Sequence, residues 1–522
     1  MDLSASAAIS PIPRTYREAL ADPNWYSAML DEYKALMANN TWSLVPRVAG
    51  ANVVTGKWLF RHKLNPDGSL ARYKARWVVR GCSQQAGVDY GETLSPVIKP
   101  ATIRTVLSLA VSEDWPIHQL DVKNAFLHGT LTETVLAQQP SGFVGPSYPK
   151  HVCRLNKSLY GLKQAPRTWF LRFTNFLFTM GFHASKSDPS LFIQNKAGRI
   201  AYLLLYVDDI ILTANSMTLL TSIINSLCCE FSMSPLQHFL GINVTRTAYG
   251  LFLSQDQYAT DILECAKMVN CNPSNTPVDT KQKPSAQTGK PVPDGTEYRS
   301  LAGALQYLTL TRPDISFAVQ QICLFMHDPR DTHMQLLKRV LLTMASLSPS
   351  HPVIVLLPTL TPIGRGVRTP VARHLGTGVF LGDNIVAWSS KQQQTVSRSS
   401  AEAEYRGVAN AVAELCWLRQ LVTELHRPPK ESSIVYCDNV STMYMHVAEP
   451  NASSTHQTCR DIPTCTSYGT ELLLATSKSY TFHQLFSSRM SSRRDCQDRC
   501  LKISVPAYTC NHLQAEGGLL DE

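Results

Sequence analysis

Two adjacent aspartates, Asp208 and Asp209, lie between strongly apolar residues in the stretch YLLLYVDDIILTA. One interpretation is a β-hairpin with Asp-Asp at its turn, because aspartate is common in turns. The other is a divalent-cation site, because Mg²⁺ prefers oxygen ligands in octahedral geometry and two carboxylates on a rigid turn supply them. The residues by themselves leave both interpretations open.

A third carboxylate is available at Asp121, which ends an apolar strand-like stretch (HQLDV). Three carboxylates on neighbouring strands would hold two metal ions roughly 3.5–4 Å apart for in-line phosphoryl transfer. One ion would lower the pKa of an attacking hydroxyl, and the other would stabilise a leaving pyrophosphate. Sequence spacing does not establish that the strands are neighbours, so the convergence of these acids is a prediction for the structure.

A basic hairpin is predicted over residues 57–80, around a type I turn at Asn-Pro-Asp-Gly. Its charged side chains are Lys57, Arg61, Lys63, Arg72, Lys74, Arg76 and Arg80 against the single acid Asp67. They form either a solvated ribbon or a flap that holds phosphates, with Arg making bidentate contacts. Tyr73 and Trp77 could stack on a base or pack on the domain beneath; packing is favoured for Trp77, which shares the apolar register of Val79.

The elements that would position these groups follow from periodicity and turn residues. We expect helices within residues 14–40, over 101–112 and over 163–181, a strand over 115–122 and a strand pair over 200–213. Five prolines within residues 272–297 predict a linker, and a further folded stretch follows over 298–340.

Composition excludes several protein classes. The chain has 522 residues, a formal charge of +9 and 44% hydrophobic residues, which predicts several folded domains with a mild basic excess. No apolar run approaches the roughly 20 residues that span a bilayer, and no signal peptide is visible. Fourteen cysteines without a framework spacing suit a reducing compartment. We therefore expect an intracellular protein, cytoplasmic or nuclear, and not a membrane protein, a disulfide scaffold or a secreted enzyme.

The C-terminal part is irregular. No acidic residue occurs between Asp331 and Asp383, and that span has no stable period. Order resumes near Gly378 with a strand, a helix over about 400–425 and a strand in SIVYCDN. Ser399 and Glu402 form a capping-box pattern for that helix. Beyond about residue 444 the periodicity fades again.

The combination of HQLDVKNAFLHGTL, SLYGLKQAPRTWF and YVDD resembles the reverse transcriptase of Ty1/copia-type LTR retrotransposon Pol polyproteins. Further similar blocks are KARWVVRG, RSLAGALQYLTLTRPDI and WSSKQQQTVSRSSAEAEYR. The resemblance implies an α+β right-hand polymerase with palm and fingers, followed by a connection and an incomplete ribonuclease H-like α/β domain. The expected segments are a helical leader (1–45), fingers and palm (46–271), a linker (272–297), a thumb- or connection-like segment (298–340), a degraded stretch (341–377), a ribonuclease H-like remnant (378–445) and an irregular tail (446–522).

The resemblance also assigns roles to residues. It places Asp121, Asp208 and Asp209 as the catalytic triad that binds two Mg²⁺ ions. It implies dNTPs, an RNA template and a DNA primer as partners, without a membrane. The nucleotide-binding positions that it implies are Arg76 and Lys74 for the triphosphate, Phe126 as an aromatic gate against a ribose 2′-hydroxyl, and Gly161 and Gln164 in the block near the nucleotide.

The chain also departs from the family. The loop around residues 233–241 is shorter than expected. Ribonuclease H needs four carboxylates, and only two of them are matched here, by Glu404 and Asp438. We therefore expect ribonuclease H activity to be lost. We also expect the remnant to lack the first strands of its sheet. Residues 359–375 and the tail read like translations in another frame. The alternative to a polymerase is therefore an inactive relic that at most binds nucleic acid.

Overall fold

The computed structural model describes most of the chain as far as residue 437 and short segments beyond it. The described residues are 9–65, 69–235, 238–247, 250–269, 271–274, 276–278, 285–345, 354–356, 365–371, 374–392, 399–429, 433–437, 472–476 and 500–501. The turn of the predicted basic hairpin (66–68) and most of the tail lie outside them.

A six-stranded sheet forms the centre of the molecule. Its strands, in spatial order, are β12 (Met233–Pro235), β5 (Ile117–Val122), β11 (Asp209–Ala214), β10 (Arg199–Tyr206), β9 (Leu191–Lys196) and β8 (His183–Ala184). β10 and β11 form the predicted strand pair, and β5 pairs with β11 in antiparallel register. The predicted strand before Asp121 is therefore confirmed as a neighbour of the YVDD hairpin.

Alternating side chains give this sheet two buried faces. Leu203, Leu205 and Leu212 share one core with helices α4 (Ala165–Thr179) and α5 (Met217–Glu230). Tyr202, Leu204 and Ile211 join the other core, together with helix α3 (Pro100–Ser112). Every residue of α3 from Ala101 to Val111 is buried. The predicted helices over 101–112 and 163–181 are thus confirmed, and they lie on opposite faces of the sheet.

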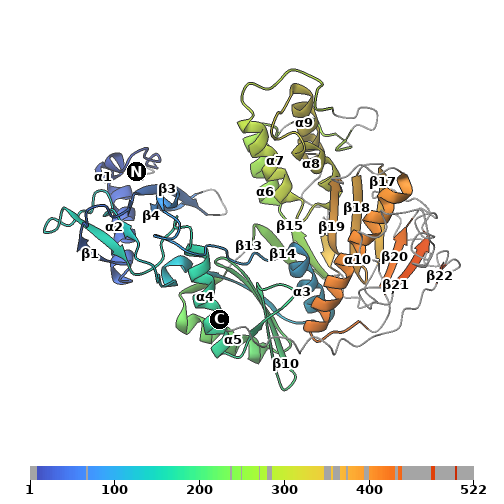
Figure 1. The fold of residues 1–522 in the computed structure, drawn as a ribbon, viewed down its shortest axis with the longest axis horizontal. Helices are drawn as coiled ribbons and strands as arrows, with labels where there is room; N and C mark the ends of the chain where they lie inside the picture. Colours follow the sequence, from blue (N-terminus) through green and yellow to red (C-terminus); the bar gives the residue numbers. More distant parts are fainter. Residues whose placement is uncertain are drawn as a thin grey trace, which may run out of the picture.

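The N-terminal lobe contains the predicted hairpin, formed by β3 (Gly56–Leu64) and β4 (Leu70–Val79), and two helices (Figure 1). Trp25 packs between His62 and Tyr73, and Trp77 is 2% exposed. Tyr73 and Trp77 therefore both pack on the protein. The remaining elements of the lobe are α1 (Tyr16–Ala21), α2 (Pro23–Ala38), η1 (Gly81–Ser83), η2 (Ala125–His128) and a sheet of β1 (Trp42–Pro46), β7 (His151–Leu155), β6 (Leu136–Ala137) and β2 (Val53–Val54).

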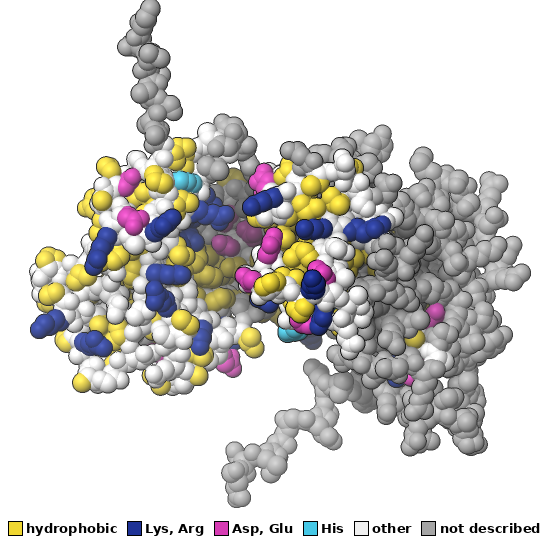
Figure 2. Space-filling view, turned by 90° about the horizontal axis from the view of Figure 1, so that it is seen from above, with side chains coloured by type: hydrophobic (Ala, Val, Ile, Leu, Met, Phe, Trp, Pro, Cys, Tyr) yellow, Lys and Arg dark blue, Asp and Glu magenta, His cyan; other side chains and the backbone are white. Residues whose placement is uncertain are grey.

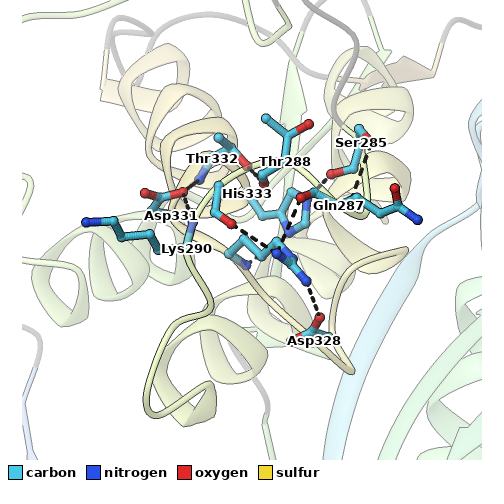
Figure 3. A network of polar contacts seen from close by, with 10 residues as sticks. Ser285, Gln287, Thr288, Lys290, Asp328, Asp331, Thr332 and His333 are labelled. Atoms are coloured by element: carbon cyan, nitrogen blue, oxygen red, sulfur yellow. Dashed lines mark hydrogen bonds and ion pairs between the residues drawn. The ribbon is translucent and has the colours of Figure 1, made fainter.

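A helical lobe follows, formed by α6 (Asp256–Cys265), α7 (Thr296–Leu308), η3 (Pro313–Ile315), α8 (Ser316–Cys323) and α9 (Asp331–Ala345). The described part of the predicted linker is attached to this lobe (Figure 3). Asp331 accepts the Lys290 N–H at 3.0 Å, Thr332 donates to the Thr288 carbonyl at 2.8 Å, and buried His333 contacts the Ser285 carbonyl at 3.0 Å. Side chains at the start of α9 thus hold residues 285–290 of the predicted linker against the helical lobe.

Two further sheets also differ from expectation. The first contains β13 (His238–Phe239), β14 (Ile242–Thr247), β15 (Gly250–Ser254) and β16 (Ile354–Leu356). The second contains β19 (Asn384–Gln392), β18 (His374–Leu381), β17 (Arg365–Val371), β20 (Ser433–Cys437), β21 (Leu472–Thr476) and β22 (Cys500–Leu501). β17 comes from the stretch expected to be degraded, and β21 comes from the tail expected to be irregular. Backbone pairing with remote partners forms them without any local period.

The C-terminal remnant shares a core with the central sheet. Residues of α10 (Ser400–Glu424), such as Val408 and Leu415, belong to the same buried cluster as α3 and Tyr202. The Ser399 hydroxyl accepts the Glu402 N–H at 3.1 Å, which confirms the predicted helix start. Figure 1 shows α10 running past α3 beside the sheet. The remnant and the central sheet are therefore one packed unit.

Arg104 of α3 joins three parts of the chain. Its Nε donates to the Val386 carbonyl of β19 at 2.7 Å, and its Nη1 donates to the Leu310 carbonyl just after α7 at 2.9 Å. Its guanidinium lies 3.8 Å from the ring centre of Trp388. Because the side chain is buried, these carbonyls have no water to replace it.

The fold as a whole is α+β, which confirms the predicted class. Within the described residues, no helix is long and apolar enough to cross a bilayer.

Replacing the buried guanidinium should destabilise the folded chain. Arg104→Met leaves the buried Val386 carbonyl and the partly buried Leu310 carbonyl without this donor, and we expect a loss of about 2–4 kcal/mol in the free energy of unfolding. Urea denaturation followed by tryptophan fluorescence measures it. Exposed Arg47→Met is the matched control. An unchanged midpoint for Arg104→Met would contradict the joining role.

Candidate active site

Three carboxylates meet at one edge of the central sheet. Asp121 of β5 is the direct antiparallel partner of Asp209 of β11, so their side chains project from the same face of the sheet. Asp208 lies in the turn between β10 and β11, and its carbonyl accepts the Val122 N–H at 2.9 Å. This face is opposite to the one that α4 and α5 cover, because the neighbouring residues Leu120 and Ile210 point toward those helices.

Burial makes the ionised acids unfavourable. It raises the pKa of Asp209 to about 6, an effect increased by Asp208 and Asp121 and opposed by the Leu240 N–H. Burial also raises the pKa of Asp208, with Asp121 adding to the effect and Arg76 opposing it. A cation placed among these groups would relieve the repulsion.

The turn that carries Asp208 is strained. Tyr206 pairs with Asp209, which leaves Val207 and Asp208 as a two-residue turn, and Val207 has φ +56°. A β-branched residue rarely adopts this conformation, and it persists only where the surroundings enforce it. The Trp169 indole of α4 donates to the Val207 carbonyl and helps to hold the turn.

A basic surface faces these acids. On β3 and β4, Arg61 lies directly opposite Lys74 and Lys63 lies opposite Arg72. Like charges directly across a strand pair are destabilising, and a bound anion would relieve their repulsion. Burial, followed by the neighbouring Arg76, lowers the pKa of Lys74 to about 8. Figure 2 shows Lys and Arg side chains beside a hollow that contains acidic side chains.

Arg76 extends from this surface toward the carboxylates. Its guanidinium lies 3.8 Å from the ring centre of Tyr160, and its Nη2 is 3.4 Å from the Asn124 side-chain oxygen. The ring of Phe126 packs on the Tyr160 ring, with the two ring centres 4.7 Å apart. Arg76, Tyr160 and Phe126 thus form a contiguous cluster beside Asp208.

Sequence reasoning missed Tyr160. Burial raises the pKa of its phenol to about 12, Arg76 opposes this, and Asp208 and Asp121 add to it. The residue lies within the SLYGLKQAPRTWF block, immediately before Gly161. That position was the available signal, but the sequence did not show which way the ring points.

Two of the predicted nucleotide-binding residues, Gln164 and Gly161, make close contacts within the protein. Gln164 is 1% exposed; its amide accepts from Gln84 at 3.0 Å and donates to the Asp89 carbonyl at 2.8 Å. Gly161 has φ +94°, and a Cβ there would lie 2.0 Å from the Val79 carbonyl oxygen. Gln164 thus braces the loop around residues 84–89, and Gly161 permits close approach of the hairpin; their nucleotide-binding role stays a prediction.

Only one of the two ribonuclease H positions lies within the described residues. Glu404 lies on α10 and is half-buried. Asp438 falls outside the described part of the chain.

The residues fit a magnesium site in donor chemistry. Three carboxylates at one sheet edge, with raised pKa values at Asp208 and Asp209, match a hard cation that prefers oxygen ligands. As they stand, no group of three or more His, Cys, Asp or Glu among the described residues is arranged to hold a metal ion. Metal binding would need the three side chains to turn further toward a common centre.

The raised pKa of Asp209 predicts that the stability of the folded chain depends on pH. Because the folded-state pKa of Asp209 is about 6, the folded chain binds that proton more tightly than the unfolded chain does, and stability falls as the pH rises through about 6. We expect Asp209→Asn to raise the Tm at pH 8 in EDTA, with a smaller gain at pH 5. Differential scanning fluorimetry checks this, with exposed Asp31→Asn as the control. An equal gain at both pH values would contradict the prediction.

Comparison with known proteins agrees with this geometry. The family described as "Reverse transcriptase (RNA-dependent DNA polymerase)" matches residues 39–280. The chain is 44% identical over 458 residues to the retrovirus-related Pol polyprotein from transposon RE1 of Arabidopsis thaliana, which covers 85% of this chain and 31% of that protein. It is 35% identical over 455 residues to the corresponding polyprotein from transposon TNT 1-94 of Nicotiana tabacum, with 83% and 34% covered.

The chain thus spans about a third of the length of these relatives. A solved foamy viral protease-reverse transcriptase in complex with double-stranded DNA matches at a TM-score of 0.48 and 12% identity, over 87% of this chain and 70% of that one. On the sequence matches, the chain belongs to the reverse transcriptase family, in the group of Ty1/copia-type retrotransposon Pol polyproteins.

Proposed function

We propose that this chain is an RNA-directed DNA polymerase that adds deoxynucleotides to a primer 3′-hydroxyl. The observation that carries the proposal is the pairing of Asp121 with Asp209 across β5 and β11, with Asp208 in the adjoining turn. Membership of the reverse transcriptase family supports the same reaction class.

Asp121, Asp208 and Asp209 would hold two Mg²⁺ ions. When bound, these ions activate the attacking hydroxyl and stabilise the charge on the leaving pyrophosphate. The protein supplies two carboxylates on one face of the sheet, Asp121 and Asp209, and a third, Asp208, in the adjoining turn. The strained turn at Val207 sets the direction of Asp208. Burial of the acids keeps competing water away and strengthens their attraction for a cation.

Arg76 would bind the triphosphate, with Lys74 beside it. Within the described part of the chain the Arg76 Nε has no hydrogen-bond partner, so the guanidinium has donor capacity that a phosphate oxygen could use if the side chain turned toward it. Lys74, on the same strand face, adds a second positive charge. A triphosphate between this surface and the carboxylates would neutralise both charged surfaces.

Phe126 would act as the gate against ribonucleotides. Its ring packs on Tyr160, which lies beside Arg76 and within the electrostatic reach of Asp121 and Asp208. A rigid ring held there leaves no room for a 2′-hydroxyl. An RNA template and a DNA primer would occupy the hollow that separates the N-terminal lobe from the helical lobe (Figure 2).

A second candidate is an inactive relic that binds nucleic acid without turnover. One observation favours it: among the described residues, the acids as they stand are not arranged to hold a metal. We also propose that ribonuclease H activity is lost, which cleavage of an RNA–DNA hybrid would test.

Removing one carboxylate should abolish polymerisation. With poly(rA)/oligo(dT), Mg²⁺ and dTTP, we expect Asp208→Asn to reduce incorporation on the order of 10²–10³-fold or more, because it removes charge that the transition state requires. Asp31→Asn, the same change at an exposed site, should keep full activity. Wild-type binding to the primer-template without incorporation would instead identify the relic.

Shortening the gate should relax sugar selection. We expect Phe126→Val to raise the ratio of UTP to dTTP incorporation by about tenfold or more, because the smaller side chain leaves space for a hydroxyl. Phe170→Val on α4 is the control for lost aromatic packing, since Phe170 contacts Phe192 on the other side of the sheet. An unchanged ratio in Phe126→Val would remove Phe126 from the gate.

A further inference from the structure

The turn between β13 and β14 contacts the carboxylate cluster directly. Phe239 pairs with Ile242, so Leu240 and Gly241 form a two-residue turn, with φ values of +53° and +63°. The Leu240 N–H donates to the Asp209 Oδ2 at 3.3 Å. This bond fixes the rotation of the carboxylate and therefore the direction of its second oxygen.

Leucine is a poor residue for this conformation. A two-residue turn with both φ values positive is formed best by Asn-Gly or Asp-Gly, because a leucine side chain crowds its own backbone there. Such a conformation persists only where other contacts enforce it. The Leu240 side chain packs against the core that contains Phe239 and Ile242, and a second contact acts on its backbone.

Tyr307 provides that contact. From α7, its hydroxyl donates to the Leu240 carbonyl at 2.6 Å. The bonds to Tyr307 and to Asp209 restrain the two peptide groups on either side of Leu240. Tyr307 is half-buried, packs on the ring of Tyr258 with ring centres 5.2 Å apart, and lies within the electrostatic reach of Asp209.

We propose that Tyr307 is a positioning residue for the carboxylate cluster: its hydroxyl holds the Leu240–Gly241 turn so that the Leu240 N–H orients Asp209. The helical lobe is in this way coupled to the candidate active site through one side chain. The inference rests on the proposed function only in taking Asp209 as a metal ligand.

Tyr307→Phe removes the hydroxyl and keeps the ring. In the full-length chain we expect amide hydrogen exchange at Leu240 to become faster. We also expect the Mg²⁺ concentration at half-maximal thermal stabilisation and at half-maximal dTTP incorporation to rise roughly 3- to 10-fold, as the loss of one hydrogen bond would give. The KM for dTTP should stay within about twofold. Tyr258→Phe, which changes the adjacent ring, is the control and should leave all of these values unchanged.

Leu240→Asn separates positioning from general packing. Asparagine adopts this turn conformation readily, so the double variant Tyr307→Phe/Leu240→Asn should recover the Mg²⁺ dependence of the parent. A lower Tm in Tyr307→Phe with unchanged Mg²⁺ dependence, or failure of the double variant to recover, would overturn the inference. Because the thermal and exchange measurements need no turnover, a wild-type chain without incorporation would refute the proposed function and leave this test intact.

Discussion

The antiparallel pairing of β5 with β11 is the contact on which the candidate site depends. It places Asp121 opposite Asp209 and leaves Asp208 in the adjoining turn, so three acids share one partly buried edge. Such crowding is unfavourable, as the raised pKa values of Asp208 and Asp209 show. It is tolerated because β10 and β11 are almost wholly apolar and buried beyond the acids, and each fully buried Leu or Ile side chain contributes about 1.5–3 kcal/mol. The sheet is thus stable enough to keep an unfavourable charge arrangement that a cation would relieve.

The features that could be predicted from the sequence are those with a strong local signal. β10 and β11 are continuous apolar runs interrupted only by the aspartates. The sequence of α3 contains no internal Gly or Pro; the helix begins at Pro100 and is followed by the polar residue Glu113. The alternation of aromatic and basic residues on β3 and β4 likewise indicated a ribbon with one packed and one charged face. That Asp121 lies close to Asp208 and Asp209 was predicted from the strands that carry them, and the antiparallel register of β5 and β11 confirms it.

Other features could not be predicted because their cause lies far away in the chain. β17 and β21 are short and lack a period, and each is ordered by pairing with β20. The direction of a side chain within a motif is equally invisible. Gln164 and Tyr160 belong to one block, but the former turns into the loop around Gln84 and the latter stacks beside Arg76. The proline content of residues 272–297 predicted a linker. It did not indicate that Asp331 and His333 would form hydrogen bonds with residues 285–290 of that segment.

The described part of residues 378–445, the segment for which we propose a loss of ribonuclease H activity, is still packed into the fold. Its helix α10 fills one side of the core that also contains α3 and one face of the central sheet. At the end of α10, Glu424 accepts hydrogen bonds from the Ser185 and Ser187 hydroxyls at 2.6 and 2.7 Å, and the Tyr202 hydroxyl donates to the Leu425 carbonyl. Removing the helix would therefore take buried apolar side chains such as Val408 and Leu415 out of this core. The segment contributes to packing whether or not its carboxylates bind a metal, because the strands that carry Asp121 and Asp209 rest on the same core.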